Sequence, residues 1–159
     1  MTLRAARWLW LALALFALPG AQPAPPPAPD YRAQVHAGVN ALRQKRDSSP
    51  LVGRDDLHRY ATGYAQELAA RGVLSHYDAQ GRALDARLNA AGLTDWRKAG
   101  ENLARGTAEG FSVDDIVKCW NLSPGHYQNI VTPEFRYTGI GWAKDAKGEN
   151  VYIVQIFLH

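Results

Sequence analysis

Apolar side chains recur every three or four residues over two stretches in the first half of the chain, which is the spacing of amphipathic helices. The first stretch begins at Asp30, a residue type that caps helices, and ends at the turn-forming residues 48–50. The second runs from Asp55 to Gly72, a glycine suited to the left-handed conformation that ends many helices. Its apolar face comprises Leu57, Tyr60, Ala61, Tyr64, Ala65, Leu68 and Ala69.

Three shorter helices are predicted after residue 80. Residues 84–91 form the first of them, and a glycine closes it. Residues 113–120 follow Ser112, a serine N-cap, and carry two aspartates where the helix dipole favours negative charge. The last helix is predicted over 124–130, because Ser123 is suited to cap it and a proline then stands at its first position.

The end of the chain changes to β character. Residues 137–144 and 150–158 are rich in aromatic and β-branched residues, and the polar stretch between them predicts an antiparallel hairpin. A further strand is expected at 99–104. Helices first and strands late predict an α+β fold, in which helices cover a small antiparallel sheet. Residues 30–159 have the length of one domain with one core.

The N-terminus has the layout of an export signal. Arg4 and Arg7 precede an apolar run of 11 residues, which ends at the residues Pro19 to Ala21. A membrane-spanning helix needs about 20 apolar residues, so the run is too short to be one. We therefore expect residues 1–21 to be a signal peptide and the protein to be secreted or periplasmic, with no transmembrane segment after cleavage. An uncleaved anchor is the alternative, and the Pro/Ala-rich residues 22–29 are expected to be an extended spacer.

Charge and cysteine content narrow the partners. Two of the 18 Lys and Arg residues lie in the leader, so the mature chain sets 16 of them against 15 Asp and Glu residues. Such a chain has no basic stripe, which argues against nucleic acid as a partner. Cys119 is the only cysteine, so the domain has no internal disulfide and is expected to be a monomer with a buried, unreactive thiol.

Four segments carry motifs that together resemble one family. They are Leu74–Gly81, which contains His76; Gly100–Gly106, which begins Gly-Glu-Asn; Val117–Ile130, which contains Cys-Trp-Asn-Leu-Ser-Pro-Gly-His; and the strands from Tyr137 to Phe157. In this order and spacing the chain resembles a bacterial member of the CAP superfamily (cysteine-rich secretory, antigen 5 and pathogenesis-related proteins). The resemblance implies an α-β-α sandwich with a central cleft.

The family's cleft holds two histidines and two glutamates. By position the histidines are His76 and His126, and the first glutamate is Glu101. The second glutamate follows the tryptophan of the preceding helix in members that have it, and here Asn121 to Ser123 stand in its place. The resemblance implies that His76, Glu101, His126, Asn102 and Ser123 line the cleft.

The remaining trio of His76, Glu101 and His126 is a ligand type known from catalytic zinc sites, so zinc is the cofactor to test. The trio is spaced at 25 residues on each side of Glu101, and only the fold can bring its members together. Two other interpretations stay open. The three residues can form a hydrogen-bonded network with no ligand. A Ser123–His126–Glu101 nucleophilic triad is disfavoured, because the serine hydroxyl is best used as a helix cap.

The leading functional hypothesis is an exported domain that binds a ligand in this cleft, without an assigned catalytic activity. The expected ligand is a small apolar molecule, a component of the cell envelope or a divalent metal. One alternative is a zinc-dependent hydrolase acting on peptides or envelope polymers. Another is an interaction module that uses its surface loops and the Pro-rich spacer.

Overall fold

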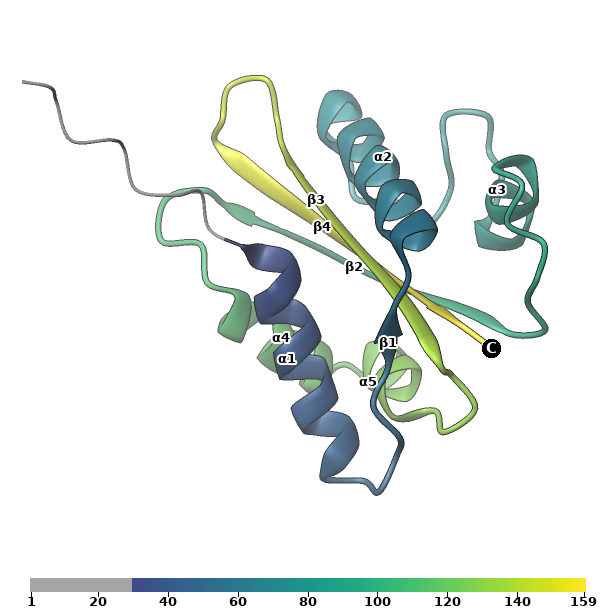
Figure 1. Ribbon diagram of the computed structural model, residues 1–159. Coiled ribbons are helices and arrows are strands. Elements are labelled where there is room, and N and C mark those ends of the chain that lie inside the picture. Colours follow the sequence, from purple (N-terminus) through teal and green to yellow (C-terminus); the bar gives the residue numbers. More distant parts are fainter. Residues whose placement is uncertain (1–29) are drawn as a thin grey trace, which may run out of the picture.

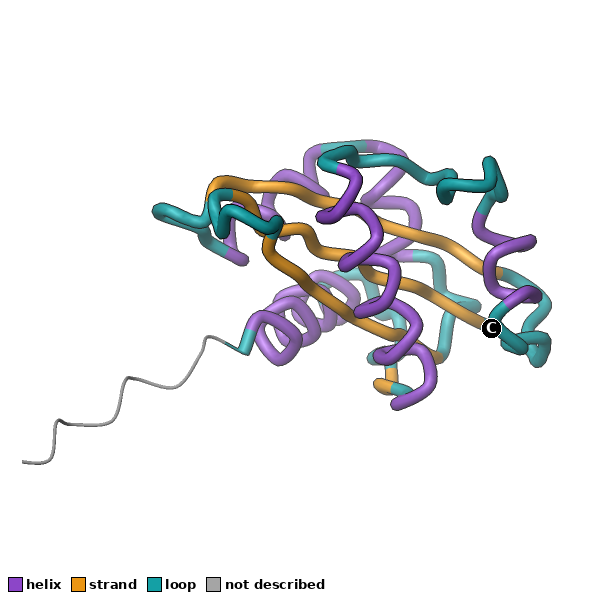
Figure 2. The backbone as a smooth tube through the Cα atoms, turned by 90° about the horizontal axis from the view of Figure 1, so that it is seen from above, coloured by secondary structure: helices purple, strands orange, loops and turns teal. Residues whose placement is uncertain are grey.

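A sheet of four strands lies between two layers of helices in the computed structural model, which describes residues 30–159 (Figure 1). The strands are β1 (Val52–Gly53), β2 (Ala99–Thr107), β3 (Tyr137–Lys144) and β4 (Asn150–Leu158), in the order β1-β3-β4-β2. The short β1 runs parallel to β3, and the other neighbours are antiparallel. One layer holds α1 (Tyr31–Gln44), α4 (Val113–Leu122) and α5 (Pro124–Val131), and the other holds α2 (Asp55–Arg71) and α3 (Leu84–Ala90) (Figure 2).

The predicted α+β sandwich is confirmed. The strands of the hairpin have the predicted bounds, whereas β2 extends three residues further, to Thr107. Two residues are too few to show a period, so β1 was not predicted. The predicted leader and spacer, residues 1–21 and 22–29, lie outside the described residues. Among residues 30–159, no helix combines the length and the apolar character needed to cross a membrane.

Strand β4 divides the interior into two cores. Its side chains alternate between the faces of the sheet, and nearly all of them are buried. Val151, Ile153 and Phe157 pack with the layer of α1, α4 and α5. Tyr152 and Val154 pack with α2 and α3. Each helical layer therefore has its own apolar cluster against a shared central strand.

Helix α2 lies directly on the backbone of β3. A Cβ atom added to Gly139 would come within 2.3 Å of the carbonyl of Leu57. One added to Gly141 would lie 2.1 Å from the amide nitrogen of Thr62. Two glycines on the same face of the strand thus set how closely helix and sheet approach, which a side chain of any size would prevent.

The helix ends follow the predicted capping chemistry with one exception. The carboxylate of Asp30 accepts a hydrogen bond from the first turn of α1, Ser112 does the same for α4, and Gly72 ends α2 with φ of 68°. Ser123 stands at the N-cap position of α5, but its side chain makes no capping bond. Cys119 is exposed on α4, so the prediction of a buried thiol was wrong.

An arginine with no acidic partner among residues 30–159 joins the end of α1 to α5 and the segment that follows it. Arg43 is fully buried, and its guanidinium donates to the backbone carbonyls of Ser49, Ile130, Thr132 and Phe135 at 2.7 to 3.0 Å. Buried charge is tolerated only where hydrogen bonds satisfy it, and here four carbonyls do so. The apolar spacing of α1 gives no sign of this role.

His58 on α2 covers the part of β3 that β1 leaves free. Strand β1 pairs only with Tyr137 and Thr138. Beyond them, the amide of Ile140 donates to Nδ1 of His58 at 2.9 Å, and Arg32 donates to the carbonyl of Ile140 at 3.2 Å. The ring of His58 is half-buried. Burial lowers the pKa of His58, because desolvation disfavours the charged ring, and the neutral ring can then accept from the amide of Ile140.

Candidate functional site

A buried ion pair forms the base of the candidate site. Glu101 lies on β2 opposite Ile156 of β4, so its side chain points to the layer of α2 and α3. There Arg87 of α3 meets it, and Nη2 of the arginine donates to Oε1 at 2.9 Å and Oε2 at 2.8 Å. The two side chains are only 2% and 3% exposed. Both oxygens of the predicted metal ligand are therefore already engaged.

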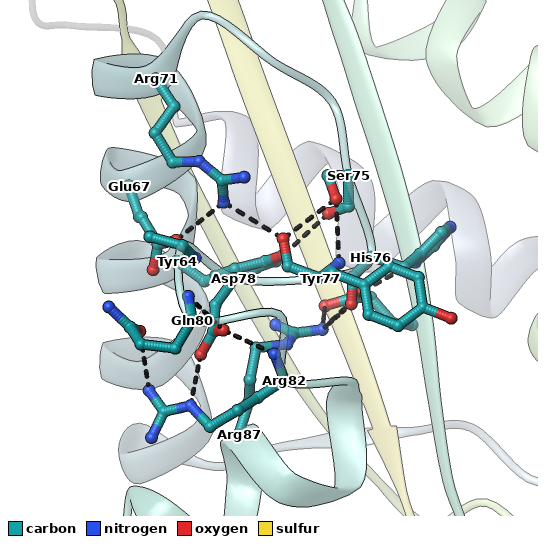
Figure 3. A network of polar contacts seen from close by, with 12 residues as sticks. Tyr64, Glu67, Arg71, Ser75, His76, Tyr77, Asp78, Gln80, Arg82 and Arg87 are labelled. Atoms are coloured by element: carbon teal, nitrogen blue, oxygen red, sulfur yellow. Dashed lines mark hydrogen bonds and ion pairs between the residues drawn. The ribbon is translucent and has the colours of Figure 1, made fainter.

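His76 completes the pair from the loop between α2 and α3 (Figure 3). Its Nδ1 lies 2.8 Å from Oε1 of Glu101, and Arg87 also donates to its backbone carbonyl at 3.2 Å. A carboxylate held by an arginine is ionised and only accepts hydrogen bonds. The network therefore assigns the proton to Nδ1 of His76, and Nε2 carries a lone pair when the ring is neutral. The imidazole is 55% exposed, so Nε2 is open to a ligand.

Two tyrosines of α2 support the arginine. The guanidinium of Arg87 lies over the ring of Tyr64, with 3.7 Å between Cζ and the ring centroid. Its Nη1 donates to the phenol oxygen of Tyr60 at 3.1 Å. Burial raises the pKa of Tyr64 to about 12 and raises that of Tyr60 as well, so both phenols stay neutral around the charged pair. Nε of Arg87 has no hydrogen-bond partner among residues 30–159.

His126 reaches the other side of β2 from α5. Neighbouring residues of a strand point to opposite faces, so Asn102 faces α5 while Glu101 faces α3. The amide of Asn102 donates to the backbone carbonyl of His126 at 3.1 Å, and its oxygen accepts from Asn129 at 2.9 Å. The pKa of His126 is lowered mainly by burial, and to a smaller extent by repulsion from a positive charge on His76.

The structure brings some of the predicted site residues into contact and keeps others apart. His76 and Glu101 are in direct contact, and His126 is close enough for the charge of His76 to influence it. Asn102 acts through the backbone of α5. No hydrogen bond within residues 30–159 joins the Ser123 hydroxyl to His126 or Glu101, so the nucleophilic triad is not assembled.

Sequence analysis missed Arg87. The helix of residues 84–90 carries this basic residue beside the buried Leu88, on its inner face. A basic residue among apolar positions, shortly before a strand with a predicted buried acid, is the signal that could have indicated the pair. Its absence from the family motifs explains why it was passed over.

The donor set does not fit a tetrahedral metal site in this arrangement. Zinc sites use deprotonated ligands that are free to coordinate, and Glu101 is bound through both oxygens by a cation. Among residues 30–159 no three His, Cys, Asp or Glu side chains are placed to hold a metal ion together. Zinc at His76, Glu101 and His126 stays a prediction from the resemblance, and the ion pair of Glu101 with Arg87 argues against it.

Zinc titrated into the protein is expected to give no saturable heat beyond that of the His76→Ala/His126→Ala variant. The reason is that zinc bound to Glu101 would have to displace Arg87. The buried guanidinium of Arg87 would then be left without its acidic partner. Isothermal titration calorimetry at neutral pH measures the difference. A saturable, one-to-one heat that the double variant lacks would contradict this expectation and support a metal cofactor.

The two shielded histidines predict that the fold loses stability on mild acidification. The pKa values of His58 and His126 lie below the ordinary value of 6.5 in the folded state. Below pH 6.5 the unfolded chain therefore binds protons that the folded chain does not, and the free energy of unfolding falls as the pH falls. One proton per histidine limits this slope to about 1.4 kcal/mol per pH unit each.

Urea unfolding between pH 7.5 and 5.0 measures this loss. His58→Asn keeps an acceptor near Ile140 but does not titrate, so the slope should become smaller in this variant. An unchanged slope in His58→Asn would show that the ring of His58 is already protonated or solvated.

Similarity to known proteins agrees with the fold described above. The sequence model of the cysteine-rich secretory protein family, CAP, matches residues 36–157. The protein YkwD of Bacillus subtilis (strain 168), described as uncharacterized, is 30% identical over 122 residues, which are 76% of this chain and 46% of that protein. This chain thus spans about half the length of that curated relative.

Two solved structures share the fold. An outer surface protein from Borrelia burgdorferi superposes with a TM-score of 0.71 at 19% identity, over 82% of this chain and 93% of that one. An extracellular protein containing an SCP domain, from Bacillus anthracis str. Ames, superposes with a TM-score of 0.68 at 21% identity, over 80% of this chain and 39% of that one. At such identities the likeness shows the fold alone.

Proposed function

This chain belongs to the cysteine-rich secretory protein (CAP) family, and we propose that it works outside the cytoplasm as a binding domain whose ligand contacts His76 and His126. The ligand is a small, largely apolar molecule that carries an uncharged hydroxyl or amide. Such a group can come from a lipid or from a component of the cell envelope. The family supplies the compartment, and the chemistry of the site supplies the ligand class.

The bond between His76 and Glu101 is the observation that carries this proposal. Because Arg87 keeps Glu101 ionised, the His76 ring presents Nε2 as an acceptor on the solvent side. His126 is neutral at pH 7 because its pKa is lowered, so its ring offers one N–H and one lone pair. Neutral hydrogen-bonding groups favour a neutral polar partner, since they do not compensate a full charge.

The loop that carries His76 also carries apolar side chains. Val73, Leu74 and Tyr77 are exposed large hydrophobic residues within three positions of the histidine. Exposed apolar groups gathered beside polar ones mark binding surfaces more often than isolated ones do. They supply contact for the apolar body of the ligand while the imidazole holds its polar end.

Hydrolysis fits the site less well. A hydrolase needs a nucleophile or a metal-bound water, together with donors for the developing oxyanion. Ser123 is not bonded to either histidine, and Glu101 is occupied by Arg87. The zinc-dependent alternative predicts turnover that a chelator abolishes and zinc restores, which separates it from binding alone.

A matched pair of probes tests the proposal. Dodecan-1-ol can hydrogen-bond to Nε2 of His76, whereas its methyl ether presents the same chain without the hydroxyl proton. The exported protein should bind the alcohol more tightly than the ether. In His76→Phe the affinity for the alcohol should fall about fivefold, and the affinity for the ether should stay unchanged. Failure of the native protein to bind the alcohol, or unchanged affinity for the alcohol in the variant, would contradict the proposal.

A further inference from the structure

A cavity of about 350 Å³ lies between α2 and α3 and borders Arg87. Its walls include the tyrosines Tyr60 and Tyr64, the small residue Gly63, and the arginines Arg59, Arg82 and Arg87. His76 is not among the residues that line it. The proposed function does not use this space.

The acidic groups of the cavity are already satisfied. Both oxygens of Asp78 accept hydrogen bonds from its own turn, from two backbone amides and from Nε of Arg82 at 2.6 Å. Oε1 of Glu67 accepts from Arg71 and from the amide of Ala79. Figure 3 shows these carboxylates turned toward their partners. A cation entering the cavity would therefore have to compete with existing ion pairs.

Several hydrogen-bond donors of the cavity are left without a partner among residues 30–159. The phenol oxygen of Tyr60 accepts from Arg87, so its proton must point elsewhere, and no acceptor for it is found among residues 30–159. Burial raises the pKa of Tyr60, which keeps that proton in place. Arg59 is exposed at the rim and takes part in none of the ion pairs described within residues 30–159. Nη1 of Arg82 is also uncommitted there.

Space for a ligand is also built into the helix. A Cβ atom added to Gly63 would meet nothing within 4 Å, so α2 presents bare backbone where the cavity opens. Besides the charged residues, the wall consists of tyrosine rings and alanines, which suit a flat apolar body. The cavity thus combines unsatisfied donors, one excess cation and apolar sides.

From this arrangement we propose that the cavity between α2 and α3 is a second binding site, which takes the carboxylate or phosphate end of a small molecule. Arg59 and the hydroxyl of Tyr60 hold the anionic oxygens, and Arg82 adds a donor from the loop before α3. The planar guanidinium groups match the two oxygens of such a group. The apolar part of the ligand lies against Gly63 and the tyrosine rings.

Three probes with the same ring test this site in the exported protein: benzoate, phenyl phosphate and benzamide. In ¹⁵N-labelled protein, benzoate or phenyl phosphate should shift the amide signals of Gly63, Ala90 and Ala91 to saturation. Neutral benzamide should bind at least about tenfold more weakly, because hydrogen bonds to a charged group are the stronger ones. Whichever anion binds more tightly identifies carboxylate or phosphate as the source.

Two variants confine the effect to the cavity. Gly63→Leu fills the open space with a good helix former, and Arg59→Gln removes the excess cation. Each variant should lower the affinity for the anion at least fivefold, and each should still unfold cooperatively. Arg105→Gln removes an exposed arginine of β2 outside the cavity and should leave the affinity unchanged. Absence of saturable shifts with both anions, or native affinity in Gly63→Leu, would overturn the proposal.

Discussion

Replacing Arg87 by methionine is expected to lower the free energy of unfolding by about 3–5 kcal/mol, the usual cost of leaving one partner of a buried ion pair uncompensated. Glu101 would then be a buried carboxylate with only the bond to His76. Tyr60 and the carbonyl of His76 would lose their donor as well. Against a total stability of about 5–15 kcal/mol for a domain, such a loss is readily measured by urea unfolding.

The double variant Arg87→Met/Glu101→Gln separates charge from packing. A neutral amide keeps an acceptor for His76 and removes the isolated charge, so much of the lost stability should return. The exposed pair of Lys98 and Glu134 provides the control, and Lys98→Met should change stability by less than about 1 kcal/mol. An Arg87→Met variant no less stable than the Lys98→Met variant would show that the buried pair is not formed.

The second large effect is expected at the contact of helix and sheet. Gly141→Ala places a methyl group 2.1 Å from the amide nitrogen of Thr62 and 2.3 Å from the carbonyl carbon of Ala61. These are backbone atoms of α2, which cannot rotate out of the way as a flexible side chain can. The helix must therefore move away from β3. We expect a loss of at least about 3 kcal/mol, at the upper end of overpacking effects, or failure to fold.

The same substitution on the helix side has the opposite sign. Gly63→Ala adds a methyl group in open space within α2 and should stabilise the protein by about 0.5–1 kcal/mol, through helix propensity. Thermal unfolding of the two variants compares them directly. Similar melting temperatures for Gly141→Ala and the native protein would mean that α2 does not lie on the strand at this glycine.

The sequence predicted elements well where a local pattern specifies them. The hairpin strands 137–144 and 150–158 combine β-branched residues with an intervening polar turn, and they have the predicted bounds. Asp30 and Gly72 end their helices by backbone chemistry that depends on few neighbours. Strand β1 has only two residues and exists because β3 lies beside it, which no local pattern reveals.

The site was predicted in part for a related reason. His76 and Glu101 were identified through a resemblance and do meet, although 25 residues separate them. Arg87 and Arg43 escaped notice because burial of a charged residue depends on which partners the fold brings to it. Ser123 was assigned a capping bond from its position alone, but the side chain does not make it. Residue type predicts what a group can do, and the tertiary contacts decide which option it takes.

The protonation pattern of His76 is the property on which the proposed function depends. Long-range ¹H–¹⁵N correlation spectra of the protein at pH 7.5 distinguish a protonated ring nitrogen from a bare one. We predict a protonated Nδ1 and a bare Nε2 for His76, and loss of this preference in Glu101→Leu. A neutral His76 ring with its proton on Nε2 in the native protein would contradict the account, because the ligand would then meet a donor and Glu101 would not hold the ring.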